Sequence, residues 1–173
     1  MAKRLVGQLP RRGVYTLIIR VEEDIRLKIG GLGIRSFPRG FYTYTGSAMG
    51  LGATSLPSRV LRHLRKDKRR RWHIDYLLAH RKVWVCGVVG TPTEERLECE
   101  INQSIKLLGR AEVPVMGFGA SDCRRGCGSH LLYFGNVDIT PLVYRVHAET
   151  AGVKPIIIRL TKRNSQMEGC VSI

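Results

Sequence analysis

The first part of the chain carries an apolar pattern that predicts short strands. Residues 13–45 are rich in β-branched and aromatic residues and are interrupted by glycine and proline, which is typical of strands joined by turns. We expect strands at residues 14–21, 25–29 and 40–45, with a turn at residues 22–24. Short connections of this kind predict an antiparallel meander.

Two amphipathic helices are predicted to follow a glycine-rich loop at residues 46–55. In the segment LPSRVLRHLRKD, Pro57 suits the first turn of a helix, because its missing N–H is not needed there. Leu56, Val60 and Leu64 recur every four residues and form one apolar stripe. The segment WHIDYLLAHR at residues 72–81 carries a similar stripe.

The second half of the chain adds strands and one long helix. We expect strands at residues 82–90, 131–135 and 154–160, where apolar runs are short and β-branched. Thr91, followed three residues later by Glu94, predicts a capped helix. This helix is expected to begin near Pro92, to end at Gly109 and to bury Leu97, Ile101, Ile105 and Leu108.

These elements predict an α+β fold with a small central antiparallel sheet flanked by helices. A chain of 173 residues is long enough to bury a substantial core in one domain. We place the main domain at residues 1–135 and a C-terminal extension, packed on the same domain and with a frayed polar end, at residues 136–173. The extension is expected to add a strand, cap the sheet or meet a partner.

The charge balance changes the expected class of partner. Lys and Arg number 29 against 14 Asp and Glu, which gives a net charge of +15. This excess favours a polyanionic partner, with nucleic acid first and an anionic membrane surface second. No apolar run reaches the roughly 18 residues of a membrane span, and residues 1–13 lack the apolar centre of a signal peptide. We therefore expect a cytoplasmic protein that binds nucleic acid and no membrane.

Five cysteines argue against a disulfide scaffold in a chain of this kind. Cys86 and Cys99 lie among apolar residues and are interpreted as core thiols. Cys123, Cys127 and His130 are spaced C-x₃-C-x₂-H and suit zinc, but a structural zinc site normally has four ligands. A packed loop, in which the thiols are buried or reactive and His130 lines a cleft, is therefore favoured over zinc.

Candidate catalytic residues gather on the first helix and on two strands. Arg59 and His63 are four residues apart and so share one face that flanks the buried stripe. Tyr15 and Tyr44 would meet beside Arg59 if the strands at 14–21 and 40–45 are neighbours. The alternatives are a solvated basic helix and strand tyrosines that only pack.

Further polar and basic residues around this region suit contact with phosphates. They are Gly46, Ser47, Arg62, Arg65, Lys66, Arg69, Arg71 and His73.

The order of these residues resembles the GIY-YIG nuclease superfamily. GVY stands at residues 13–15, YTG at 44–46, SA follows directly, and Arg59 and His63 come on the next helix. The resemblance spans residues 13–134. It implies a small antiparallel sheet flanked by helices that cuts nucleic-acid phosphodiesters, with a tyrosine that helps to activate water, a helix arginine that stabilises the phosphate, and a glutamate on a later helix that binds one divalent metal.

The spacing points to one branch of that superfamily. An inserted hairpin separates Tyr15 from Tyr44, and the loop before Arg59 is long. A branch of largely uncharacterised proteins has this spacing and segments similar to RWHIDYLL and GFGASDC, so the chain looks like a member of that branch.

Two glutamates compete for the metal that the resemblance implies. At about 100° per residue, Glu98 lies closer than Glu100 to the centre of the apolar stripe and would face the sheet. We therefore assign Glu98 as the ligand of Mg²⁺ or Mn²⁺, with Glu100 in reserve. The alternative is that both are solvated carboxylates.

The resulting hypothesis is a metal-dependent endonuclease that hydrolyses phosphodiester bonds in DNA. Damaged or branched DNA is its candidate substrate, and DNA repair is its candidate role. Its catalytic residues would be Tyr15, Tyr44, Arg59 and His63. One rival is a non-catalytic nucleic-acid-binding module that keeps the fold. A third and less favoured hypothesis is an RNA-binding or RNA-processing protein with a zinc-stabilised loop. The sequence does not indicate an oligomeric state.

Overall fold

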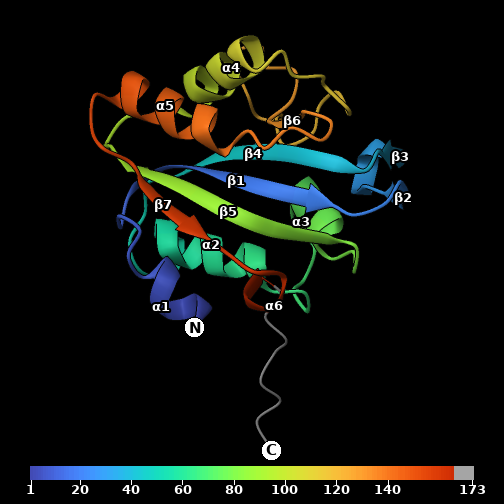
Figure 1. The fold of residues 1–173 in the computed structure, drawn as a ribbon, viewed down its shortest axis with the longest axis horizontal. Helices are drawn as coiled ribbons and strands as arrows, with labels where there is room; N and C mark the ends of the chain where they lie inside the picture. Colours follow the sequence, from blue (N-terminus) through green and yellow to red (C-terminus); the bar gives the residue numbers. More distant parts are fainter. Residues whose placement is uncertain (166–173) are drawn as a thin grey trace, which may run out of the picture.

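The computed structural model, which describes residues 1–165, has three layers with a sheet in the middle (Figure 1). The sheet has the strand order β6-β4-β1-β5-β7, and all neighbours are antiparallel. This confirms the predicted α+β fold class. The strands are β1 (Gly13–Val21), β4 (Gly40–Ala48), β5 (Val83–Pro92), β6 (Leu131–Tyr133) and β7 (Ile156–Arg159).

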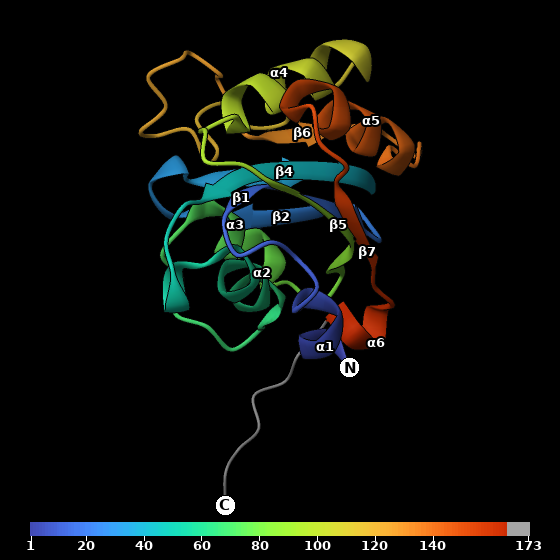
Figure 2. The same ribbon diagram turned by 90° about the vertical axis from the view of Figure 1, so that its left-hand side faces the viewer.

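Helices cover both faces of the sheet, as the two views show (Figures 1 and 2). One face carries α1 (Ala2–Val6), α2 (Leu56–Leu64), α3 (His73–Leu78) and the short α6 (Lys162–Ser165); the other carries α4 (Glu98–Leu108) and α5 (Thr140–Ala151). Single 3₁₀ turns lie at Gly30–Leu32 (η1) and Gly52–Thr54 (η2). None of the helices in residues 1–165 is long and apolar enough to cross a membrane.

The central strand β1 is buried on both sides, which explains its nearly continuous apolar sequence. Tyr15, Leu17 and Ile19 belong to the core under α2 and α3, whereas Val14 and Ile18 belong to the core under α4 and α5. Alternate residues of one strand therefore supply two separate cores.

The predicted meander is wrong in one respect. β2 (Ile25–Lys28) does not join the central sheet but pairs with β3 (Ile34–Phe37) in a separate two-stranded sheet. β3 was not predicted, because three of its four residues are exposed and carry no apolar pattern. β1 instead pairs directly with β4, as the convergence of Tyr15 and Tyr44 requires.

The predicted start of the long helix is also wrong. Thr91 is a residue of β5, where it pairs with Val14, and its hydroxyl lies 2.8 Å from Nδ1 of His147. α4 begins only at Glu98 and has Gly109 as its C-cap. The sheet pairing continues to Pro92 and so prevents a helix there. Leu108 is 52% exposed, whereas it was predicted to be buried.

Residues 136–165 are part of the same structure as residues 1–135. β7 extends the central sheet by pairing with β5, and α5 packs beside α4, with Val143 and Val146 in their shared core. α5 was not predicted, and it ends at Gly152, which has the positive φ of 66° that favours glycine. The predicted frayed end of the extension lies partly in residues 166–173, outside the described residues.

Candidate active site

A cleft of about 640 Å³ opens beside the C-terminal part of β4. β6 pairs only with Tyr42 to Tyr44, so residues 45–48 of β4 extend past it. Side chains from both faces of the sheet can therefore reach the same space. The lining includes Tyr15, Tyr44, Gly46, Ser47, Arg59, His63, Arg71, Trp72, His73, Arg96, Glu98, Gly119, Asp122 and His130.

Tyr15 and His63 form a buried hydrogen-bonded pair in the wall of this cleft. The Tyr15 hydroxyl lies 2.8 Å from Nε2 of His63, while Nδ1 of His63 has no hydrogen-bond partner among the described residues. Burial raises the pKa of Tyr15 to about 12 and lowers the pKa of His63 to about 3. Both groups are therefore neutral near pH 7.

Tyr44 stands next to this pair. β4 places Tyr44 opposite Leu17 of β1. Leu17 is two residues from Tyr15, so Tyr44 lies on the same sheet face as Tyr15. Its ring meets His63 edge-on, with 6.1 Å between the ring centroids. Burial, followed by the charge of Tyr15, raises the pKa of Tyr44 well above its ordinary value.

Arg59 reaches the cleft from α2 and is held by two neighbours. Its Nη1 donates to the carbonyl of Ser47 at 3.1 Å, and its guanidinium carbon lies 5.3 Å from the ring centroid of Trp72. α2 itself begins with a side-chain cap, because Ser55 accepts from the N–H of Ser58. The arginine therefore enters the cleft with a fixed orientation.

Of the two glutamates considered for the metal, only Glu98 lines the cleft. Its Oε2 is buried and has no hydrogen-bond partner among the described residues. Glu100 is exposed and lies 2.7 Å from Nη1 of Arg125. A buried carboxylate oxygen without a partner is costly, and it is a suitable ligand for a hard divalent cation.

Two residues predicted to contact phosphate are instead committed to the fold. Arg62 donates to both carboxylate oxygens of the buried Asp75, at 2.7 and 2.9 Å. Lys66 donates to the carbonyls of Leu78, His80 and Val83, and burial lowers its pKa to about 8. Their donors are thus already engaged within the protein, which leaves both residues fewer free donors for the predicted phosphate contact.

Of the other residues predicted to contact phosphate, some line the cleft and others do not. Gly46, Ser47, Arg71 and His73 line the cleft; Nδ1 of His73 also accepts from the N–H of Gly119 at 3.1 Å. The structure does not bring the exposed Arg65 and Arg69 into the cleft lining. Nδ1 of His73 therefore ties α3 to the loop that closes one side of the cleft.

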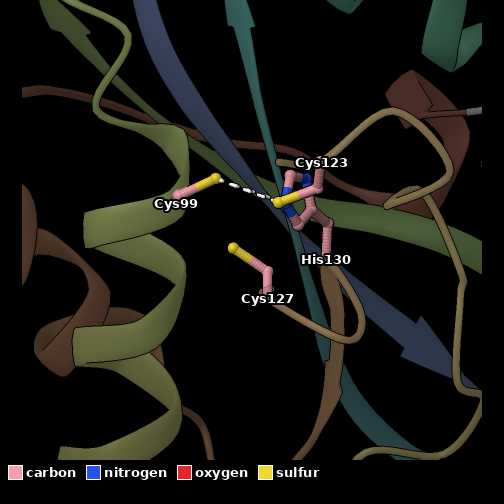
Figure 3. Close-up of side chains that lie close together, drawn as sticks. All are labelled: Cys99, Cys123, Cys127 and His130. Atoms are coloured by element: carbon pink, nitrogen blue, oxygen red, sulfur yellow. Dashed lines mark hydrogen bonds between the residues drawn. The ribbon is translucent and has the colours of Figure 1, made fainter. Parts of the chain in front are cut away.

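Three predicted residues form a cluster with a fourth that was assigned to the core. The thiols of Cys99, Cys123 and Cys127 and the imidazole of His130 point toward one another (Figure 3), and their ligand atoms all lie within 4.8 Å of one another. Cys99 is buried as predicted, but among these polar groups. Cys86 stays apart and donates to the carbonyl of Ile18.

The cluster contains thiols of different acidity. Burial, followed by the neighbouring thiols of Cys127 and Cys123, raises the pKa of Cys99 well above its ordinary value. Although burial acts in the opposite direction, hydrogen bonds involving Cys127 and the backbone lower the pKa of Cys123 to about 6. Burial also raises the pKa of Cys127.

Sequence reasoning missed Trp72, Arg96 and Cys99 as residues of functional interest. The ring of Trp72 lies against Arg59, Arg62 and His63, and Arg96 lines the cleft beside Glu98. Trp72 could have been noted as an aromatic residue within the basic segment KDKRRRW. For Cys99 no local signal exists, since its partners lie more than 20 residues away in the chain.

Comparisons with known proteins give one relationship. Neither the curated proteins nor the solved structures compared with this chain gave a significant match. One family model, described as "Domain of unknown function DUF123", matches residues 14–151, from the second residue of β1 to the end of α5. The chain belongs to the DUF123 family.

Proposed function

We propose that this protein is a metal-dependent endonuclease that hydrolyses phosphodiester bonds in DNA. The observation that carries the proposal is the content of one cleft: a fixed arginine, a hydrogen-bonded tyrosine–histidine pair and an unpartnered glutamate oxygen. These groups supply charge stabilisation, proton transfer and metal binding, which are the requirements of phosphodiester hydrolysis. The resemblance to the GIY-YIG nucleases, proposed from the motif order, supports the same function.

Glu98 would bind the divalent metal. Mg²⁺ and Mn²⁺ prefer oxygen ligands and retain several waters, so one protein carboxylate together with substrate phosphate is sufficient. The exposed Asp122 also lines the cleft and is a second candidate carboxylate. When bound, the metal would polarise the phosphate and lower the pKa of a bound water.

Arg59 would offset the negative charge that develops on the phosphate. Its hydrogen bond to the Ser47 carbonyl and its contact with the Trp72 ring orient the guanidinium before substrate arrives. An oriented donor loses little freedom when the charge forms, and this is the basis of its expected contribution. Arg71 and Arg96 add positive charge to the same lining.

Tyr15, Tyr44 and His63 would handle protons. In the free protein the shared hydrogen bond between the Tyr15 hydroxyl and His63 Nε2 joins two neutral groups. A bound phosphodiester adds negative charge nearby, which raises the pKa of the histidine. Under that influence His63 can hold a proton passed through the Tyr15 hydroxyl, while Tyr44 donates a hydrogen bond.

The test is cleavage of labelled duplex, single-stranded, branched and damaged DNA, and of the matching RNA, with Mg²⁺ or Mn²⁺. Glu98→Gln and Arg59→Ala are each expected to abolish cutting while DNA binding persists. Glu100→Gln and Arg65→Ala are the matched controls, since these exposed residues lie outside the cleft lining, and both should cut like the wild type.

A non-catalytic nucleic-acid-binding module is the second candidate. The pKa shifts of the proton-transfer pair favour it, because a Tyr15 pKa of about 12 and a His63 pKa of about 3 leave neither group with a pKa close to 7 before substrate binds. If the protein binds nucleic acid in a salt-sensitive way but cuts none of the substrates, this alternative is established. If it cuts RNA and not DNA, the choice of DNA as substrate is overturned.

A further inference from the structure

We propose that Cys99, Cys123, Cys127 and His130 bind one Zn²⁺ ion, which fastens the loop of residues 109–130 onto α4. The chemistry of the donors selects the metal: three thiols and one imidazole form a soft set that suits zinc and not Mg²⁺. Four ligands complete a tetrahedral structural site. The C-x₃-C spacing of Cys123 and Cys127 also lies in the usual range for structural zinc.

The distances between the donors are close to those of a loaded site. With Zn–S of about 2.3 Å and Zn–N of about 2.0 Å, a tetrahedron places two sulfurs about 3.8 Å apart and a sulfur and nitrogen about 3.5 Å apart. In the structure Sγ of Cys99 lies 3.5 Å from Sγ of Cys123 and 3.8 Å from Nε2 of His130. Shifts of less than about 1 Å would complete the coordination, since no two ligand atoms are more than 4.8 Å apart.

The donors come from two parts of the chain that the fold brings together, α4 and the loop of residues 109–130. Cys99 is in the first turn of α4, Cys123 and Cys127 are in the loop, and His130 directly precedes β6 (Figure 3). A disulfide between Cys99 and Cys123 would use two of these groups and leave Cys127 and His130 unexplained. A metal ion uses all four.

The loop has the features of a segment that a metal ion would fasten. Residues 109–130 contain no helix or strand, and a segment of that length without regular structure is uncommon in a compact domain unless it has a function. Gly126 and Gly128 have positive φ angles of 68° and 73°, so the backbone turns sharply on both sides of Cys127. Asn102 and Gln103 of α4 bind the carbonyls of Ser129 and Cys127, which already seats the loop on the helix.

The site adjoins the cleft without being part of its chemistry. Glu98 and Asp122 line the cleft and directly precede the ligands Cys99 and Cys123, and His130 lies in both places. An ion that fixes the ligands also fixes this wall of the cleft. With four protein ligands it keeps no open position for substrate, so its role is structural.

The first measurement is the zinc content of the purified wild-type chain under reducing conditions, by inductively coupled plasma mass spectrometry. About one zinc per chain is expected from a complete four-ligand set. The double variant Cys123→Ser/Cys127→Ser should lose the metal, while Cys86→Ser, which changes a cysteine outside the cluster, should keep it. Absence of zinc from the wild type, or zinc retained in the double variant, would overturn the proposal.

A second measurement uses only the wild type, so its result does not depend on whether the variants fold. Co²⁺ exchanged into the chain should give the visible absorption of a tetrahedral thiolate site, and added Zn²⁺ should abolish it. A count of free thiols in denatured, chelator-treated protein separates zinc from a disulfide: all five cysteines should react. Two missing thiols, or an octahedral cobalt spectrum, would contradict a Cys₃His zinc site.

Limited trypsin digestion tests what the ion holds. Arg124 and Arg125 are exposed and lie between Cys123 and Cys127, so removal of zinc should accelerate cleavage after them. Cleavage in the basic segment 65–71 is the internal control and should not change. Glu98→Gln should keep its zinc even where cutting of DNA is lost, so failure of the nuclease proposal and failure of the zinc proposal give different results.

Discussion

The hydroxyl of Tyr15 lies 2.8 Å from Nε2 of His63 and joins β1 to α2 inside the cleft. The two residues are separated by 48 positions in the chain. Their contact depends on the placement of α2 against the sheet face that carries Tyr15, Leu17 and Ile19.

Tyr15→Phe tests this relationship directly, because it removes the hydroxyl and keeps the ring. If the pair moves a proton, cleavage should fall by about 10²-fold or more. Stability should fall by about 1 kcal/mol, because Nε2 of His63 loses its partner. Tyr76→Phe, outside the cleft lining, is the control. Unchanged single-turnover rates in Tyr15→Phe would remove Tyr15 from the catalytic set.

Gly46→Ala tests the same contact from the other strand. A Cβ at Gly46 would lie 2.8 Å from the Tyr15 hydroxyl, so either Tyr15 or the β4 backbone must shift, and the contact between Tyr15 and His63 is disturbed. Overpacking of this kind costs about 1–3 kcal/mol, and cleavage should fall with it. Gly31→Ala is a matched control, since its Cβ would meet nothing within 4 Å. Wild-type activity in Gly46→Ala would show that the position of Tyr15 is not critical.

Arg62→Ala is expected to act on stability and not primarily on DNA affinity. Asp75 is completely buried, and its carboxylate is bound by both terminal nitrogens of Arg62. Loss of the arginine leaves the buried carboxylate with two backbone N–H donors and with Lys68, 3.9 Å away, as its remaining cation; the expected cost is about 3 kcal/mol. Arg65→Ala should change unfolding by less than about 0.5 kcal/mol. Urea denaturation distinguishes the two, and equal midpoints would contradict the assigned role of Arg62.

His147 is expected to make stability depend on pH. It is fully buried between Thr16 and Thr91, and burial lowers its pKa from 6.5 to about 3. The neutral form is therefore favoured in the folded state, so its contribution is complete above pH 6.5 and is lost as the pH falls toward 3. Over that window one such histidine changes the free energy of unfolding by about 1.4 kcal/mol per pH unit.

The measurement for His147 is urea denaturation of the wild type and of His147→Asn at several pH values between 3 and 7. The slope of stability against pH should be smaller in the variant, whatever its absolute stability. His63 should contribute to the slope that remains, since its pKa is also lowered to about 3. Identical slopes in the two proteins would argue that His147 does not titrate in the folded state as proposed.

Arg96→Ala tests the cleft as the place where nucleic acid binds. Each phosphate contact contributes about −0.9 to the slope of log affinity against log salt concentration for duplex DNA. The variant should therefore bind more weakly and with a shallower slope. Arg145 on α5, which lies 3.9 Å from Glu149, provides the control variant Arg145→Ala. Equal salt slopes in Arg96→Ala and the wild type would place the DNA elsewhere.

Local patterns predicted most elements of the fold. The apolar run of β1, the stripe Leu56, Val60 and Leu64 of α2, and the late run in β7 were all identified. Elements with weak local patterns were missed, namely the exposed β3 and α5. The helix start near Thr91 was wrong, because pairing with β1 extends β5 through a sequence that resembles a helix cap.

Residues of the candidate site were predictable where their position on one face of a single helix was enough to place them. Arg59 and His63 share a helix flank, and Glu98 lies nearer than Glu100 to the buried stripe of α4; the structure places all three in the cleft lining. The roles of Arg62 and Lys66 were not predictable in this way. Their acceptors, Asp75 and the carbonyls near residue 80, belong to segments that come later in the chain.

The sequence by itself determined the α+β class, the faces of the main helices and the excess of positive charge, because these depend on residue type and on spacing over a few positions. Only the tertiary structure decided that Cys99 joins Cys123, Cys127 and His130, and that Tyr15 meets His63. The physical reason is that such contacts depend on how strands pair and on which sheet face each helix covers. Spacing along the chain does not encode these arrangements.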